Sequence, residues 1–414
     1  MAGVSTLKYW VWLASLDGVA VKTLLNLLEH FGSPEKVFFA SESDYEEVEG
    51  IKGSDIKRLT EKNLVLARKI IADCEENDYR IITLGDAEYP ARLKNIFDPP
   101  IVLYVSGRLP VMDEEAAIAV VGTRKCTPYG IKAAERIGYE LTKAGCLVVS
   151  GLARGIDTAS AMGVLRAGGR VVGVIGSGLD VVYPKENKKL YDDVCSTGAI
   201  VSEYPPGTQP DGWHFPARNR IMSGMSVGIT VIEAPKSSGA LITASRALEQ
   251  GRDIFAVPGN IDSPACEGSN TLLREGAILV TSGHDIAEEY VALYPEKLIK
   301  DKQTEEVPLD NKIAGKLVKR IIGAAGERKP EKRSREQETP VNIADVYAEY
   351  IAKMEGISEI EMKVISAINA PETFVDDIII STELPAQTVL STLTMLEIDG
   401  HIIQESGKRF SLNI

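Results

Sequence analysis

Short runs of apolar residues, rich in Val and Ile, recur along the middle of the chain, and each run except the last is followed by a helical or loop-plus-helical segment. Near-continuous apolar strands that alternate with helices are typical of a parallel sheet covered by helices on both faces. We therefore predict an α/β body built on an extended Rossmann-like, doubly wound parallel sheet of about seven strands. The predicted strands lie at 117–121, 147–150, 171–175, 199–202, 228–232, 253–257 and 277–280, and a further strand-like run lies at 101–105.

The pattern differs on the N-terminal side of this body. Apolar residues recur at helical spacing between Leu24 and Phe31, and residues 1–75 as a whole favour helices. The stretch Glu47–Ile56 has the form of a helix-hairpin-helix turn, in which backbone amides can face a DNA phosphate. The alternative is a small helical bundle whose glycines only form turns. We favour the bundle, because Glu46, Glu47 and Glu49 beside the turn would repel phosphate.

The C-terminal part of the chain first loses this periodicity and then regains it. Residues 295–356 are rich in charge and indicate a solvated linker. Helical patterns at about 359–369, 374–381 and 386–397 then precede two strand-like segments, which is the order of a winged-helix domain. The third of these helices is expected to expose Gln387, Thr388, Ser391 and Thr392 and has no Lys or Arg, so contact with protein, or an auxiliary role with DNA, is favoured. The predicted domains are 1–78 (helical), 79–294 (Rossmann-like), 295–356 (linker) and 357–414 (winged helix).

Glycine-rich loops and cations gather where the predicted strands end, which is the edge at which sheets of this kind bind ligands. The loop after the run at 228–232 is the clearest case, since Lys236, Ser237, Ser238 and Gly239 fall where the strand ends and the next helix starts. Unpaired backbone amides and the helix dipole at such a place attract an anion such as phosphate. We therefore predict an anion-binding rim. Its cations are Arg124, Arg154, Arg218, Arg220 and Lys236.

Signatures of other chemistry are missing from the sequence. It contains neither GxGxxG nor GxxxxGK[ST], so a nicotinamide enzyme and a P-loop ATPase are disfavoured. The five cysteines have no CxxC spacing, and we expect no metal site and no cofactor. Asp157 and Glu233 follow predicted strands and could act as general bases, but helix capping by Asp157 and an ion pair of Glu233 with a nearby Arg explain them as well. His214 is the histidine beside the rim, and we predict no catalytic residue.

Composition and net charge add little to the predicted fold and anion-binding rim. The 414 residues carry a formal net charge of −13, which disfavours indiscriminate coating of nucleic acid but is compatible with a local basic groove. We recognise no secretory signal and no apolar run approaching the ~18 residues of a membrane span. The expected location is the cytoplasm, without membrane contact.

Six stretches together resemble the DNA-processing protein A family (DprA, also called Smf), and the resemblance covers nearly the whole chain. It implies a protein without catalytic turnover that binds single-stranded DNA, protects incoming strands and loads a RecA-type recombinase in natural transformation (competence) and recombination. It also implies a homodimer formed through the Rossmann-like body. The stretches are Val121–Arg124, Ser150–Asp157, Phe215–Ser226, Glu233–Ala244, Gly251–Gly259 and Gly268–Ala277.

Within these stretches, the resemblance implies phosphate contacts from Arg124, Arg218, Asn219 and Arg220. It also places Lys236, Ser238 and Gly239 in the adjacent pocket. The family's usual Ser-Gly-Ser-Leu reads Ser238-Gly-Ala-Leu here, so one hydroxyl is missing from the loop.

Aromatic side chains also lie near these cations in the sequence. Single-stranded DNA binds to cations together with flat side chains on which bases stack, each stacked base contributing about 1–3 kcal/mol. Trp213 and Phe215 precede Arg218 and could either stack on bases or form a hydrophobic lid over the sheet edge.

Two other functions stay open. A nucleotide-processing hydrolase, similar to the phosphoribohydrolases of the lysine-decarboxylase-like group, could use the same rim, although their Pro-Gly-Gly-x-Gly-Thr loop reads Pro235-Lys-Ser-Ser-Gly239 here. The second is a transcription regulator whose main functional part is the winged-helix domain.

Overall fold

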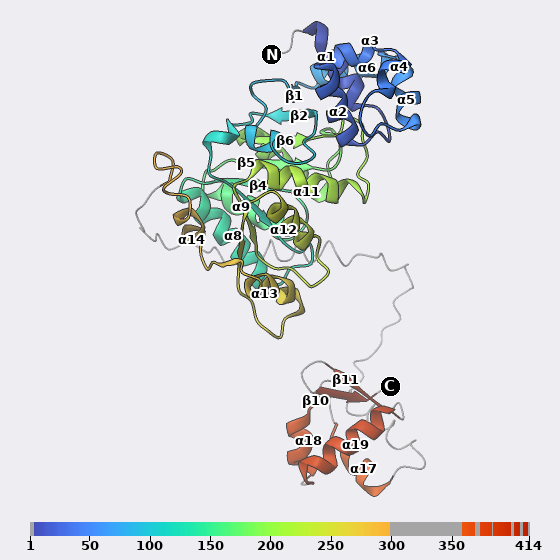
Figure 1. Cartoon of the computed structure of the whole chain (residues 1–414). Coiled ribbons are helices and arrows are strands. Elements are labelled where there is room, and N and C mark those ends of the chain that lie inside the picture. Colours follow the sequence, from blue (N-terminus) through green and yellow to red (C-terminus); the bar gives the residue numbers. More distant parts are fainter. Residues whose placement is uncertain are drawn as a thin grey trace, which may run out of the picture. The chain divides into compact units, whose positions relative to one another are not determined.

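The computed structural model of the protein describes residues 4–298, 358–368, 373–382, 384–398, 401–405 and 409–412 (Figure 1). These residues fall into two compact units, one with the described residues up to 298 and one with those from 358 on. The predicted linker at 295–356 lies, from residue 299 on, outside the described residues. Within the described ranges, no helix has both the length and the apolar character needed to cross a membrane.

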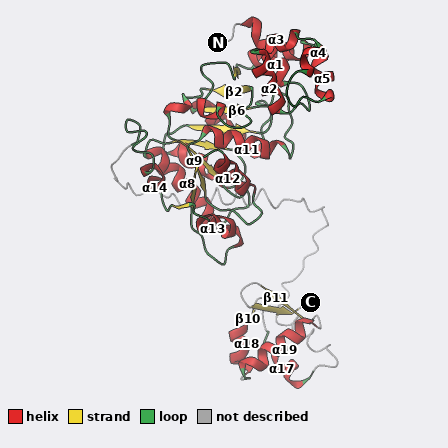
Figure 2. Cartoon of the chain, in the orientation of Figure 1, coloured by secondary structure: helices red, strands yellow, loops and turns green. Residues whose placement is uncertain are grey.

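A sheet forms the centre of the N-terminal unit (Figure 2). It has nine strands, in the order β1-β2-β6-β5-β4-β3-β7-β8-β9. Strands β3 to β9 pair in parallel and coincide with the predicted apolar runs, which confirms the doubly wound parallel sheet. The prediction did not include the antiparallel edge, in which β1 pairs with β2 and β2 with β6. The strands are β1 (Arg80–Thr83), β2 (Val102–Gly107), β3 (Ala117–Val121), β4 (Leu147–Ser150), β5 (Val171–Ile175), β6 (Ala199–Ser202), β7 (Gly228–Val231), β8 (Asp253–Ala256) and β9 (Ile278–Leu279).

Helices cover both faces of this sheet, and the side chains of β3 divide between the two. Ile118 and Val120 belong to the core that contains α8 and α9, whereas Ala117, Ala119 and Val121 belong to the core that contains α11 and α12. This alternation follows from the two-residue repeat of a strand, and apolar side chains on both faces explain why the runs are continuous. The helices are α7 (Ala91–Lys94), α8 (Pro128–Lys143), α9 (Ile156–Arg166), α10 (Lys188–Thr197), α11 (His214–Met225), α12 (Gly239–Glu249), α13 (Glu267–Arg274) and α14 (Gly283–Glu288), with short 3-10 turns η1 (Met112–Glu114), η2 (Lys185–Asn187) and η3 (Pro264–Cys266).

The N-terminal residues form a helical bundle at the end of the sheet that carries β1 and β2 (Figure 1). The candidate helix-hairpin-helix stretch is the turn between the fourth and fifth of these helices. Its apolar residues Val48 and Ile56 are buried in the core, as expected for the bundle. The helices are α1 (Val4–Ala14), α2 (Val21–Phe31), α3 (Pro34–Phe39), α4 (Glu42–Glu46), α5 (Gly53–Thr60) and α6 (Val65–Glu76).

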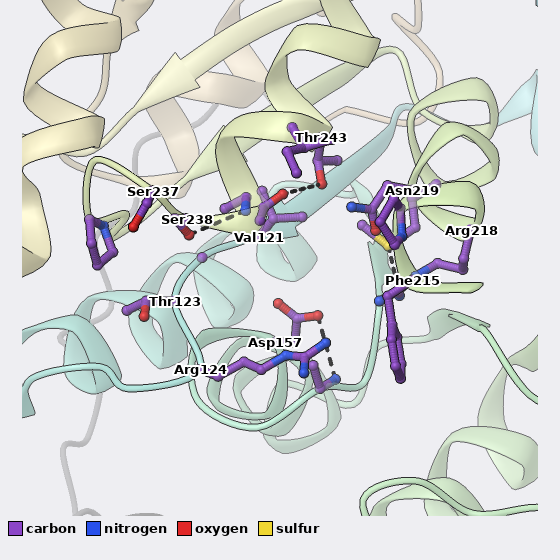
Figure 3. A pocket seen from close by; sticks show the side chains of 18 of the residues that line it. Val121, Thr123, Arg124, Asp157, Phe215, Arg218, Asn219, Ser237, Ser238 and Thr243 are labelled. Carbon is purple, nitrogen blue, oxygen red and sulfur yellow. Dashed lines mark hydrogen bonds between the residues drawn. The ribbon is translucent and has the colours of Figure 1, made fainter. Parts of the chain in front are cut away.

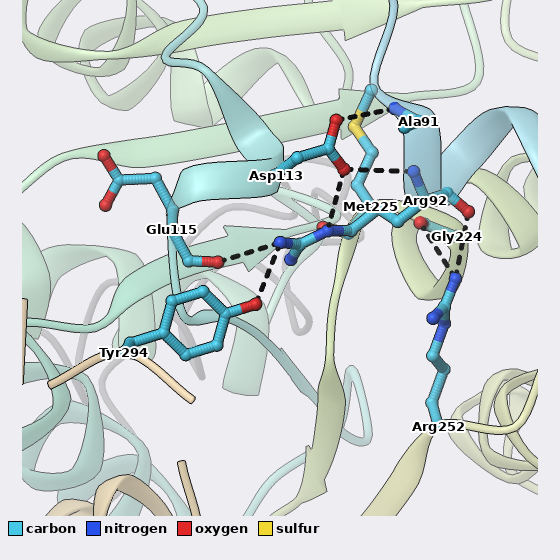
Figure 4. Close-up of polar contacts among 8 residues, drawn as sticks. All are labelled: Ala91, Arg92, Asp113, Glu115, Gly224, Met225, Arg252 and Tyr294. Atoms are coloured by element: carbon cyan, nitrogen blue, oxygen red, sulfur yellow. Dashed lines mark hydrogen bonds and ion pairs between the residues drawn. The ribbon is translucent and has the colours of Figure 1, made fainter. Parts of the chain in front are cut away.

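A partly buried arginine, Arg92, joins several segments of this unit (Figure 4). Arg92 of α7 pairs through Nε with Asp113 at 3.3 Å, and its Nη2 donates to the carbonyl oxygen of Glu115 and to the hydroxyl of Tyr294, both at 3.1 Å. Arg252 in turn donates to the carbonyl oxygen of Arg92 at 3.0 Å. Segments that lie up to about 200 residues apart in sequence are thus held by one side chain.

The C-terminal unit has the winged-helix arrangement. Helices α17 (Glu359–Ser366), α18 (Val375–Thr382) and α19 (Ala386–Ile398) pack around a separate core with a three-stranded sheet in the order β10-β12-β11. The strands are β10 (Thr373–Phe374), β11 (Ile402–Glu405) and β12 (Arg409–Leu412). The exposure expected for Thr392 was wrong, because Thr392 lies on the buried side of α19, whereas Ser391 is exposed.

Candidate nucleic-acid interface

A pocket of about 390 Å³ opens where β3 and β7 lie side by side (Figure 3). The chain leaves β3 toward α8 on one face of the sheet and leaves β7 toward α12 on the other. The two loops therefore separate, and a crevice forms at this switch point, the place where ligands of doubly wound sheets bind. The lining comes from the β3–α8 loop, the start of α9, one side of α11 and the β7–α12 loop.

The structure brings together most, but not all, of the site residues expected from the sequence. Arg154, Arg220 and Lys236 are not among the residues that line the pocket. The expected residues that do line it are Arg124, Phe215, Arg218, Asn219, Ser238 and Gly239.

Arg124 is an exposed cation of the pocket, and it lies over an aromatic ring. Its guanidinium carbon lies 4.8 Å from the centroid of the Phe215 ring, a cation–π contact. The Phe215 ring, which is half-buried, is 5.5 Å from the ring of Tyr183. The two rings form an apolar surface, and the charged guanidinium group of Arg124 lies over the Phe215 ring. Its five N–H groups can still donate hydrogen bonds to a phosphate. Trp213, by contrast, is 65% exposed and packs edge-on against Tyr204 and His214.

Arg218 also lines the pocket but lies deeper than Arg124. Its side chain is buried, and Nη1 donates to the carbonyl oxygen of Val174 at 2.6 Å. The guanidinium fits there because residue 151 is glycine: a Cβ at Gly151 would lie 1.9 Å from Nη1. The buried Nε of Arg218 has no hydrogen-bond partner among the described residues.

A buried carboxylate also lines the pocket. Burial raises the pKa of Asp157 and lowers the pKa of Arg218, and in each case the opposite charge of the other side chain offsets part of the effect. Asp157 belongs to the first turn of α9, which follows Gly155. Gly155 has a φ of 80°, and a Cβ there would lie 2.4 Å from the carbonyl oxygen of Thr123, so the close approach of these two loops depends on glycine.

The β7–α12 loop supplies the helix start expected from the sequence. The Ser238 hydroxyl accepts a hydrogen bond from the backbone N–H of Ala240 at 3.2 Å and caps α12, which begins at Gly239. The positive end of the helix dipole thus faces the pocket. The side chain of Lys236 is 83% exposed and lies 3.8 Å from Glu267, outside the pocket lining.

Two expected cations are held by carboxylates elsewhere. Arg220 is buried and pairs with Glu203 at 2.6 Å and Asp98 at 3.2 Å. Burial disfavours its charge, but the two carboxylates outweigh that effect, and the pKa of Arg220 lies above its usual range. Arg154 is ion-paired with Glu186. Arg220 therefore lies among acidic partners from distant segments, and the phosphate contact expected of it stays a prediction.

The other candidate bases have structural partners. Glu233 is fully buried and accepts hydrogen bonds from the backbone N–H of Thr127 at 2.9 Å and from its hydroxyl at 2.5 Å, rather than pairing with an arginine as expected. His214 is buried, and its Nδ1 lies 3.0 Å from the carbonyl oxygen of Gly176. Neither side chain lines the pocket.

Sequence reasoning did not single out several polar lining residues. Thr123 and Lys125 flank Arg124, so the rule that ligands bind at strand ends could have found them. Thr243 lies one turn into α12 and carried no signal, because a threonine at that position is ordinary in a helix.

Comparison with known proteins agrees with this geometry. The chain matches the family model described as DNA recombination-mediator protein A over residues 80–291. The protein named Smf of Synechocystis sp. is 32% identical over 97% of this chain and 98% of its own length. The chain belongs to the DNA recombination-mediator protein A family. The DprA/Smf resemblance predicted from the motifs is thereby confirmed.

Other members of the family match the same body. The DNA processing protein DprA of Streptococcus pneumoniae is 47% identical over 49% of this chain and 71% of its own length. An X-ray structure of DNA processing protein A from that species superposes with a TM-score of 0.61 at 37% identity, covering 68% of this chain and 97% of that one. The C-terminal unit matches the model of the DprA winged helix domain over residues 355–408, which confirms the winged helix.

Proposed function

We propose that this member of the family is a non-catalytic single-stranded DNA-binding protein whose strand lies in the pocket between β3 and β7. The observation that carries the proposal is the exposed Arg124 stacked on Phe215 at the switch point, opposite the capped start of α12. A cation, the positive end of a helix dipole and a flat ring suit a phosphate and its base together. The names of the relatives, which are DNA processing proteins, support DNA as the ligand.

The proposed contacts differ in kind among the residues. Arg124 and the exposed Lys125 are suited to contact phosphate, and Phe215 is suited to stack on a base. Asn219, Ser238 and Gly239 line the wall and offer neutral donors.

The remaining expected residues take other roles in the proposal. Arg218 and Arg220 act as positioning residues, because their guanidinium groups are buried against the protein. Arg154 and Lys236 are exposed near the rim, so they would contact only DNA that extends beyond the pocket.

We further infer from the family that the protein acts in the cytoplasm, protects single strands and loads a RecA-type recombinase in natural transformation or homologous recombination. A homodimer through the α/β body is part of the same proposal. Support for the dimer comes from β9, the open edge of the sheet, where Leu279 is 57% exposed. An apolar strand edge favours pairing with another chain.

The proposal is tested by fluorescence anisotropy with a single-stranded oligonucleotide, the matching duplex and a nucleoside monophosphate at two salt concentrations. We expect the single strand to bind most tightly and its affinity to fall with salt. Equal or tighter binding of the duplex would contradict the proposal. Release of free base from the monophosphate would instead favour the hydrolase, for which Asp157 is the carboxylate that lines the pocket.

A further inference from the structure

A second cavity, of about 320 Å³, lies at the same edge of the sheet on the other side of the β3–α8 loop. One wall is the first half of α8, and the opposite wall comes from the segments that follow β8 and β9. It shares no lining residue with the pocket between β3 and β7. The lining residues that matter here are Tyr129, Lys132, Arg136, Val257, Pro258 and Thr281.

An exposed aromatic ring stands at this cavity in a fixed position. Tyr129 is 49% exposed although it belongs to the first turn of α8. Its hydroxyl donates to the carbonyl oxygen of Pro258 at 2.8 Å, which ties the ring across the cavity to the end of β8. A ring held in place loses little conformational freedom when a flat ligand stacks on it.

Two cations lie one helical turn apart on the same wall. Lys132 is exposed, and Arg136, four residues later, projects from the same side of α8. Arg136 uses only Nε for its pair with Glu140 at 2.7 Å, and Glu140 is itself fixed by the backbone N–H of Gly283 at 2.8 Å. The terminal amino groups of Arg136 and the ammonium of Lys132 have no other partner among the described residues and remain available for an anion.

The rest of the wall is largely apolar. Pro258, which is half-buried, provides surface of the kind that a base covers, and Thr281 adds one hydroxyl. The two cations suit the phosphate of a nucleotide, and the fixed ring and the apolar wall suit its base. An acidic protein segment would use the two cations but has no need of the ring.

We propose that this second cavity is a nucleotide subsite that holds the same single strand after it leaves the pocket between β3 and β7. The inference rests on the proposed function. Lys125 lines the first pocket and Tyr129 the second, and four residues of chain span at most about 14 Å. The strand therefore needs only to pass over the short β3–α8 loop, whose residues Arg124 and Lys125 are exposed cations.

The test compares a thymidine dinucleotide with an oligothymidylate of about 20 nucleotides, of which only the long one reaches both sites. A variant with K132A and R136A together is measured by anisotropy against the unchanged protein. We expect its affinity for the short oligonucleotide to be unchanged. For the long one we expect a loss of roughly tenfold, and a slope of log K against log salt that is smaller by about 1.4, for two lost phosphate contacts.

Three further variants serve as controls for the effects of charge and of folding. K143A removes an exposed lysine from the far end of α8 and should change neither affinity. K132Q leaves the Arg136–Glu140 pair intact and should reproduce part of the loss if the double variant folds poorly, and Y129A should weaken only the long oligonucleotide.

Three outcomes would overturn the inference. The first is unchanged affinity of the double variant for the long oligonucleotide, and the second is an equal loss for both lengths, which would indicate a general effect of charge. The third is loss of binding to poly-glutamate while DNA binding is unchanged, which would assign the cavity to an acidic protein segment. If the unchanged protein binds neither oligonucleotide, the proposed function itself fails, which is a distinct result.

Discussion

Asp157 and Arg218 show how single residues shape the charge of the candidate site. Arg124 is exposed and is the proposed phosphate contact, whereas Arg218 and Asp157 are buried and partly offset each other. The net positive charge that a phosphate encounters therefore depends on whether Asp157 carries a proton.

Lowering the pH should strengthen binding of oligothymidylate, whose bases do not become protonated in the acid range. Burial raises the pKa of Asp157, so as the pH falls toward that value the carboxylate becomes neutral and one negative charge leaves the pocket. We expect a gain of about fivefold, the effect of roughly 1 kcal/mol from one charge. D157N should bind more tightly at neutral pH and lose this pH dependence. A D157N protein with the same pH profile as the unchanged protein would count against the role of Asp157.

Arg220 should affect stability much more than the chemistry of binding. Replacing it by Ala leaves Glu203 and Asp98 without their cation in a partly buried place, and we expect the free energy of unfolding to fall by about 3 kcal/mol. Urea unfolding of R220A followed by circular dichroism measures this. If R220A is as stable as the unchanged protein but binds no DNA, then Arg220 contacts the ligand directly.

The sequence predicted the pocket residues whose position follows from a strand end. Arg124, Ser238 and Gly239 each come at the end of a strand or the start of a helix, and parallel strands bring those places together. Arg154 and Arg220 were equally cationic in the sequence. Their partners Glu186, Glu203 and Asp98 lie 17 to 122 residues away in the chain, a pairing that no local pattern reveals.

At the scale of elements, α7 shows how a short helix is fixed by contacts rather than by its own propensity. It spans only Ala91–Lys94, and Asp113 accepts hydrogen bonds from the backbone N–H groups of Ala91 and Arg92 at 2.6 and 3.0 Å. The side chain of Arg92 then links α7 to η1, the start of β3 and Tyr294 (Figure 4).

Replacing Arg92 by Ala should therefore destabilise the N-terminal unit by about 2–3 kcal/mol, since several buried acceptors lose their donor at once. The measurement is the midpoint and slope of urea unfolding. R80A is the matched control, because the Arg80–Glu88 pair is solvent-exposed and its loss should change stability by less than about 1 kcal/mol. Equal effects of the two substitutions would show that the Arg92 network adds nothing.

The strands could be predicted from the sequence where their apolar run is long. Seven parallel strands were found because each is a continuous apolar run, and in β3 to β7 every residue is buried. Strand β1 was missed because it has four residues, of which Arg80 is exposed and Ile81 half-buried, so it resembles a loop.

At the scale of the whole molecule, the proposed dimer depends on the open edge of the sheet. L279E should place a charge on β9 and reduce self-association, which light scattering coupled to gel filtration would detect as a fall in mass toward that of one chain. L293E is the control, because Leu293 is also exposed, at 70%, but lies outside the strands. A mass that L279E leaves unchanged would exclude this edge as the interface.

The proposed function depends on the binding of single-stranded DNA in the cationic pocket at the β3–β7 switch point. It is tested most directly by the salt dependence of oligothymidylate binding for the unchanged protein and R124A. We expect R124A to bind about tenfold more weakly, with a slope of log K against log salt that is smaller by about 0.7, for one lost phosphate contact. Identical affinity and identical slope for the two proteins would contradict it.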